Sequence, residues 1–244
     1  HLPDPDAGLA ALRAVLKPQG ALHLMVYATY GRAGIYMLQD YCRRLGIGET
    51  DAELLELADT LNALPREHPL VHLIQHSPDF FTPAGLADTF LHPQDRAYTV
   101  PELFDFLQQG GFVFGRWLWQ AQYLPQCGAL ATTPHCARLG RLSKLEQYAA
   151  VELLRGTILR HSVIAYRDDH VDADNSLDFE SDRWPSFVPI MRGSTTYVQT
   201  QLPAGAAAVL INQGHTYRDL ILPLDSYEKC LFDGIDGKRS IDQI

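Results

Sequence analysis

The stretch that decides the fold is residues 1–28, HLPDPDAGLAALRAVLKPQGALHLMVYA. Asp4 or Asp6 can cap a helix in which leucines recur at helical spacing. The Pro-Gln-Gly turn at 18–20 ends this helix, because proline cannot continue a helix and glycine tolerates a tight turn. Residues 21–28 then predict an apolar strand of the kind buried on both faces of a parallel sheet. Helix, turn and strand form half of a βαβ unit, whose other half we expect before residue 1.

These residues resemble the class I S-adenosylmethionine-dependent methyltransferases. In that family HLPDP-type residues follow the fourth strand, and LKPGG-type residues precede the fifth. Here Leu-Lys-Pro-Gln-Gly stands at 16–20, with Gln19 in place of the usual first glycine. The pattern Thr-x-x-Glu-Leu…Gly-Gly-Phe over 99–112 is similar to the helix and sixth strand of the family. His-Ser-Val-Ile-Ala-Tyr-Arg at 161–167 resembles its last strand, which inserts antiparallel beside the sixth.

The resemblance implies an α/β fold, the C-terminal half of a Rossmann-like class I methyltransferase sheet. The glycine-rich loop and the ribose-binding acidic residue of the family would both precede His1, and no G-x-G-x-x-G occurs in the 244 residues. The resemblance therefore implies that S-adenosylmethionine binds only together with a missing N-terminal part. It implies few cofactor contacts from this chain, near His1, Leu2 and Asp4.

The function implied is that of the C-terminal part of a bacterial S-adenosylmethionine-dependent methyltransferase, inactive by itself. It would transfer a methyl group to an oxygen or nitrogen nucleophile of a small molecule or a protein. The alternative is a non-catalytic binding or regulatory module that kept the second half of the fold. A glycine-rich turn upstream, with an acidic residue about 20 positions later, would favour the enzyme.

Aromatic side chains follow the strand at 21–28. Ligands collect at the carboxyl ends of strands in doubly wound sheets, so we expect Tyr27 and Tyr30 at the substrate side. Arg32 and Tyr36, at the start of a helix predicted over 34–45, would extend this substrate-binding wall. The alternative is that these tyrosines belong to an amphipathic helix and pack with their hydroxyls at the surface.

Residues 34–97 exceed what the family core holds at this place, and we interpret them as a helical insertion or lid over the active site. A second helix is predicted over 49–64. The family uses such insertions for substrate specificity.

The segment 79–98 is rich in polar and aromatic side chains. His92 is the predicted general base for the acceptor's proton, Asp88 its orienting partner, and Tyr98 a further substrate contact. The alternative is a loop whose polar groups satisfy backbone atoms. The histidines at 68, 72 and 76 recur every four residues, but Pro69 interrupts them and no acidic residue is placed as a fourth ligand, so we expect no metal site.

The domains expected are a partial methyltransferase domain at 1–167, an acidic linker at 168–182 and a small C-terminal module at 183–244. Within the first, a helix is predicted over 138–155 and a strand over 157–167. The module should be α+β and winged-helix-like. Its predicted elements are strands at 197–202, 207–212 and 218–222, a helix at 225–235 and another from Ser240.

Composition excludes several classes of protein. A net charge of −9 and the absence of a dense Lys/Arg run argue against nucleic-acid binding. No apolar run approaches the 18 residues that a membrane span needs. The four cysteines form no C-x-x-C pair, so we expect free thiols in a cytoplasmic protein. The protein could form a homodimer.

Overall fold

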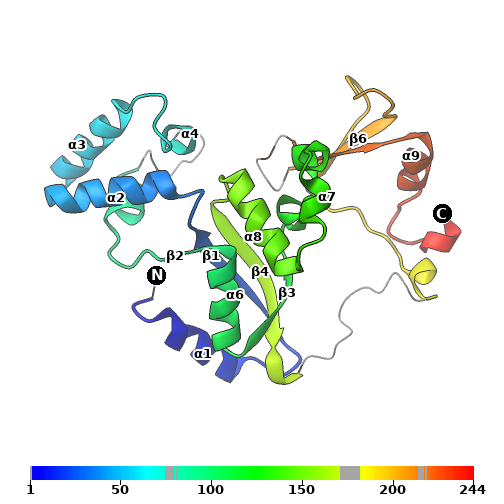
Figure 1. Ribbon diagram of the computed structural model, residues 1–244, viewed down its shortest axis with the longest axis horizontal. Coiled ribbons are helices and arrows are strands. Elements are labelled where there is room, and N and C mark those ends of the chain that lie inside the picture. The colour runs from blue at the N-terminus through cyan, green and yellow to red at the C-terminus, as the bar shows by residue number, and fades with distance from the viewer. Residues whose placement is uncertain (1, 75–79, 81, 171–181, 214–216, 218) are drawn as a thin grey trace.

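The computed structural model describes residues 2–74, 80, 82–170, 182–213, 217 and 219–244. Figure 1 shows three lobes: a central sheet covered by helices, a helical lobe on one side and a smaller lobe near the C-terminus on the other. The 171–181 part of the expected linker lies outside the described residues.

The central sheet has four strands in the order β2-β1-β4-β3. They are β1 (Ala21–Ala28), β2 (Ala97–Tyr98), β3 (Phe112–Trp117) and β4 (Arg160–Arg167). Strand β2 is parallel to β1, whereas β4 is antiparallel to both β1 and β3. The predicted antiparallel insertion of residues 161–167 beside the preceding strand is confirmed. The strand predicted over 157–167 begins three residues later than expected.

Three helices cover one face of the sheet, namely α1 (Pro5–Val15), α6 (Val100–Gln109) and α8 (Lys144–Arg155). Local signals set their starts. The Asp4 side chain accepts from the Ala7 N–H at 2.9 Å and caps α1. Thr99 and Glu102 form a capping box on α6. The buried core under these helices includes Leu9, Leu103 and Val163.

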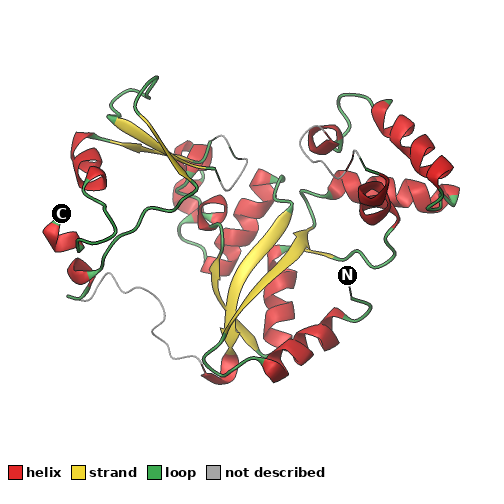
Figure 2. Cartoon of the chain, turned by 180° about the vertical axis from the view of Figure 1, so that it is seen from behind, coloured by secondary structure: helices red, strands yellow, loops and turns green. Residues whose placement is uncertain are grey.

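The prediction that β1 is buried on both faces is wrong. Leu22, Leu24 and Val26 pack against the core, but His23 and Met25 on the opposite face are exposed. In the view from behind, no described helix lies over this second face (Figure 2). Strand β1 is also unpaired along most of one edge in the described structure, because β2 pairs only with Tyr27 and Ala28.

In the sequence, the residues of the helical lobe lie between β1 and β2. It contains α2 (Ala33–Leu45), α3 (Asp51–Asn62), α4 (Val71–Ile74), α5 (Pro83–Leu86) and the π-helical turn η2 (Ala87–Leu91). Helix α2 ends at Gly46, which adopts the left-handed conformation, and Thr50 and Glu53 form a capping box on α3. The helices predicted over 34–45 and 49–64 are thus present. Leu38, Leu57, Leu70 and Phe90 belong to a hydrophobic core of this lobe.

One predicted helix is divided in two. Residues 138–155 were expected to be continuous, but α7 (Cys136–Leu139) ends before α8 begins at Lys144. Ser143 caps α8 by accepting from the Glu146 N–H at 3.3 Å, and a serine engaged in this way favours a new helix start over continuation. The single-turn 3-10 helices η3 (Gln120–Tyr123) and η4 (Gly128–Thr132) precede α7.

The C-terminal lobe contains an antiparallel sheet in the order β5-β6-β7. Its elements are η6 (Trp184–Ser186), β5 (Thr195–Val198), β6 (Ala208–Asn212), β7 (Ile221–Leu224), α9 (Ser226–Asp233) and η7 (Ile241–Gln243), and η5 (Asp168–His170) precedes them. The helix expected from Ser240 is only a 3-10 turn, so the winged-helix-like arrangement stays a prediction. Asp219 connects the C-terminal lobe to the central lobe. Its carboxylate lies 3.3 Å from the Arg155 guanidinium and accepts a hydrogen bond from the Ala129 N–H.

Candidate functional site

The candidate site lies where β1 ends and the chain turns into α2. Gly31 occupies the middle of this turn. A Cβ atom there would lie 2.1 Å from the carbonyl oxygen of Ile158, so the backbone of the turn approaches that of the segment before β4 more closely than any side chain permits. Glycine at 31 therefore fixes the turn from which Tyr30 and Arg32 project.

Replacing Gly31 with Ala should lower the free energy of unfolding by about 1–3 kcal/mol, because backbone must move to relieve the contact. The matched control is Gly193→Ala, since no atom lies within 4 Å of a Cβ at that position. Urea unfolding followed by circular dichroism measures both variants. Equal stability of the two variants would contradict the close approach.

Arg32 is the centre of a cluster of aromatic and charged side chains. Its guanidinium carbon lies 3.6 Å from the centroid of the Tyr27 ring, a cation–π distance. Arg32 Nε donates to the Tyr36 hydroxyl at 3.1 Å. Arg32 also forms an ion pair of 2.9 Å with Asp95, whose side chain is only 1% exposed. Burial raises the pKa of the Tyr36 hydroxyl and the neighbouring Arg32 partly offsets this, so the phenol stays protonated at neutral pH.

Three of the five predicted substrate-binding residues thus come together: Tyr27, Arg32 and Tyr36. Tyr30 lies in the same turn and is 39% exposed. Tyr98 belongs instead to the hydrophobic core, where its ring lies 5.1 Å from that of Phe106, and burial raises its pKa. The substrate-binding roles of all five stay predictions.

His92 ends the helical lobe immediately after η2. Its Nδ1 accepts from the backbone N–H of Gln94 at 3.1 Å, and its side chain is half-buried. Asp88 lies in the first turn of η2 and is exposed. A neutral imidazole has one lone pair, and here that lone pair faces Gln94. A general-base role therefore requires His92 to release this hydrogen bond or to change its ring orientation.

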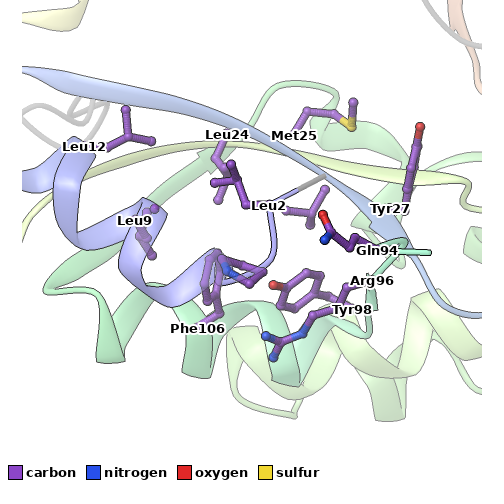
Figure 3. Close-up of a pocket in the computed structure, with 13 residues that line it drawn as sticks. Leu2, Leu9, Leu12, Leu24, Met25, Tyr27, Gln94, Arg96, Tyr98 and Phe106 are labelled. Carbon is purple, nitrogen blue, oxygen red and sulfur yellow. The ribbon is translucent and has the colours of Figure 1, made fainter. Parts of the chain in front are cut away.

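A groove of about 270 Å³ runs between α1 and the unpaired edge of β1 (Figure 3). Its lining is mainly apolar, with Leu9, Leu24 and Val26 among it. Its polar groups come from Tyr27, Gln94, Arg96 and Tyr98. Of the predicted cofactor contacts, Leu2 lines this groove, Asp4 is engaged in capping α1, and His1 lies outside the described residues.

A buried polar network crosses the central core. His161, fully buried on β4, has its Nδ1 at 2.8 Å from the Tyr123 hydroxyl and its Nε2 at 3.0 Å from the Tyr98 carbonyl. The Tyr98 carbonyl can only accept, so in a neutral imidazole Nε2 carries the proton and Nδ1 accepts from the Tyr123 hydroxyl, whose pKa burial raises well above its usual value. Glu152 Oε1 lies 3.2 Å from Nε2 but accepts no hydrogen bond, since the ring N–H is directed at the carbonyl. Its Oε2 accepts from the Val100 N–H at 2.8 Å. The expected core position of His161 is confirmed.

Asp95 and Gln39 are the cluster residues that the sequence did not reveal. Gln39 lies on α2, and its amide donates to Asp95 Oδ2 at 2.9 Å and to the Thr89 carbonyl at 2.9 Å. More than fifty positions separate Gln39 from Asp95, and no motif spacing connects them. Asp95 belongs to the polar segment 79–98, which was the available signal.

Neither a candidate metal cluster nor a membrane-crossing helix occurs in the described residues. There, no group of three or more His, Cys, Asp or Glu side chains is arranged to hold a metal ion, and the position of His76 falls outside this set. No described helix has the length and apolar character to cross a membrane. All four cysteines are free thiols, as expected.

No protein-family model matches the sequence. A curated relative, the uncharacterized protein syc1184_c of Synechococcus sp. (strain ATCC 27144 / PCC 6301 / SAUG 1402/1), is 32% identical over 170 residues, which are 63% of this chain and 38% of the relative. The structure of PKMT2 from Rickettsia typhi is similar with a TM-score of 0.57 at 10% identity, covering 98% of this chain and 47% of that one. The same protein in complex with AdoHcy gives a TM-score of 0.55 at 9% identity, over 94% and 45% of the two chains.

The chain spans less than half the length of each of these proteins. The PKMT2 structures are methyltransferase structures, and at this level of identity the likeness concerns the fold. The mixed α/β architecture is consistent with the expected methyltransferase-like fold.

Proposed function

We propose that this chain is the C-terminal part of an S-adenosylmethionine-dependent methyltransferase that methylates an oxygen or nitrogen nucleophile of a small molecule or a protein. The observation that carries the proposal is the antiparallel strand β4 between β1 and β3. This is the arrangement that the resemblance to class I methyltransferases implies. The likeness to a structure in complex with AdoHcy, the product left when S-adenosylmethionine gives up its methyl group, supports the same reading.

The unpaired edge of β1 supports the presence of a complementary half. A strand edge leaves a row of backbone N–H and C=O groups without partners, and proteins normally cover such edges. Here the edge adjoins the apolar groove beside α1, and Met25 on the uncovered face is 46% exposed. A further parallel strand in line with β2, with helices behind it, would pair this edge and bury both apolar surfaces.

The described residues do not by themselves fit the cofactor. The groove offers mostly carbon atoms, and the Asp4 carboxylate is occupied by the Ala7 N–H. A nucleoside with a ribose and an amino-acid tail needs several donors and acceptors at fixed places. We therefore assign cofactor binding chiefly to the complementary half, and the acceptor side to this chain.

On the acceptor side, Tyr27, Tyr30, Arg32 and Tyr36 form one wall in this proposal. Methyl transfer depends on positioning the nucleophile and excluding water. The phenol rings supply apolar area with a polar tip, and Arg32 holds the rings of Tyr27 and Tyr36 in place. His92, with Asp88 nearby in sequence, takes the proton that an O–H or N–H acceptor must lose.

The direct test uses a polypeptide that contains residues 1–244 together with a cofactor-binding half. It should transfer labelled methyl groups from S-adenosylmethionine to an acceptor present in an extract of small molecules and proteins. If it binds the cofactor but methylates nothing, or binds none, the alternative of a binding or regulatory module takes its place. We propose that the protein acts in the cytoplasm, without nucleic acid or membrane, and that it can form a homodimer.

Residues 1–244 alone should bind S-adenosylmethionine or AdoHcy weakly or not at all, because no glycine-rich turn and no ribose-binding acidic residue are assembled. Isothermal titration calorimetry measures this directly. A dissociation constant on the order of micromolar would mean that the cofactor site is built from this chain. The assignment of cofactor binding to the complementary half would then be wrong.

A further inference from the structure

The helical lobe is connected to the sheet by two short connecting segments, the crossings. The chain leaves β1 through residues 29–32 and returns through residues 92–96 to β2. The buried residues of the lobe form a hydrophobic cluster that shares no member with the cluster under the sheet. Two separate cores joined by two short crossings can change their relative position without losing either core. What holds the crossings together therefore determines where the lobe lies.

One carboxylate joins the two crossings. Arg32, at the end of the first, lies 2.9 Å from Asp95 Oδ2 in the second. Gln39 on α2 donates to the same oxygen at 2.9 Å, and its amide also reaches the Thr89 carbonyl of η2. Arg32 in turn covers the Tyr27 ring at the end of β1. Asp95 Oδ2 thus joins Arg32 to Gln39 on α2, and the Gln39 amide extends the connection to η2.

The other carboxylate oxygen of Asp95 has no such partner. Oδ1 is buried and accepts no hydrogen bond among the described residues. A buried acceptor without a donor is costly, and a buried ion pair adds little net stability over a well-packed apolar alternative. The arrangement is therefore poorly explained as a device for stability alone. If the two crossings moved apart, water could reach Oδ1 and donate a hydrogen bond to it. This hydration favours release of the lobe as a unit.

We propose that Asp95 is a positioning residue whose clamp with Arg32 and Gln39 fixes the helical lobe, α2 to η2, against the carboxyl end of β1. The lobe has two positions, one clamped and one released, and the acceptor side of the site is complete only in the clamped one. This last clause depends on the proposed methyltransferase function, whereas the clamp itself does not.

Hydrogen exchange of the full chain, followed by mass spectrometry, tests the clamp without cofactor or acceptor. In Asp95→Asn, amides of residues 29–33 and 92–97 should exchange at least about tenfold faster than in the wild type. Amides of α3 and β4 should keep their wild-type rates. The matched control is Asp40→Asn, which removes the exposed ion pair of α2 with Arg43 and should change no segment.

Two results would overturn the proposal. Unchanged exchange in both crossings would mean that Asp95 does not hold them. Equal acceleration in α3 and β4 would mean that Asp95 contributes to overall stability only. If Asp95→Asn does not fold, Gln39→Met removes one donor at similar volume and should accelerate the crossings by about threefold in the same pattern. If the wild-type complete protein transfers no methyl group while Asp95→Asn shows the expected acceleration in the crossings, the proposed function is wrong and the clamp stands.

Discussion

His92→Ala should lower the turnover of methyl transfer in the complete enzyme about a hundredfold or more, if the imidazole takes the acceptor's proton. Cofactor affinity should be nearly unchanged, because the proposed function assigns His92 to the acceptor side and not to cofactor binding. The Nδ1 lone pair now accepts from the Gln94 N–H, so the base must exchange this bond for the acceptor's proton. Initial rates with the acceptor identified by methyl labelling provide the measurement.

A second variant separates chemistry from local structure. Asparagine can accept a backbone N–H two residues ahead, as His92 does, so His92→Asn keeps the turn but removes the base and should be as inactive as the alanine variant. His135→Ala, at an exposed histidine before α7, should retain full turnover. Wild-type turnover in His92→Ala would reduce the 92–96 segment to a packing role, and activity in His92→Asn alone would assign the effect to the turn.

Glu152→Ala should lower the free energy of unfolding by about 2–4 kcal/mol, the sum of an unsatisfied buried donor and a cavity. The side chain is only 1% exposed, and its Oε2 satisfies the Val100 N–H at the start of α6. Removal would also take away the carboxyl oxygen that lies 3.2 Å from His161 Nε2. The midpoint of urea unfolding, followed by far-UV circular dichroism, measures the effect.

Glu146→Ala is the control for this variant, because Glu146 lies on the same helix and is exposed. It should change stability by less than about 0.5 kcal/mol. Glu152→Gln retains an acceptor for Val100 and should lie between the two. A Glu152→Ala protein as stable as the control would show that water or a neighbouring group replaces the carboxylate.

Local chemistry accounts for what the sequence predicted. The starts of α1, α3 and α6 follow from capping residues within four positions, and the bounds of β1 follow from the Pro-Gln-Gly turn before it. The division of residues 138–155 was missed because Leu139, Leu142 and Leu145 keep helical spacing across it, whereas the cap at Ser143 decides the local backbone.

Tertiary contacts account for the features that the sequence did not predict. Arg32 was identified from its place after a strand, but its partner Asp95 lies 63 positions away. The same is true of Glu152 and Val100, at a separation of 52. Whether one face of β1 is exposed depends on which elements pack on it. The sequence of an apolar strand is the same whether those elements belong to this chain or to another part of a protein.

The position of β4 has a consequence for synthesis on the ribosome. Strand β1 pairs with β4 only after about 130 further residues have been made, which at 5–20 residues per second takes roughly 7–26 s. The helical lobe has mainly local contacts and can fold during this interval. The edge of nascent β1 that β4 will pair stays free during this interval, so chaperones that bind extended apolar segments should act on this chain until residue 167 has left the exit tunnel.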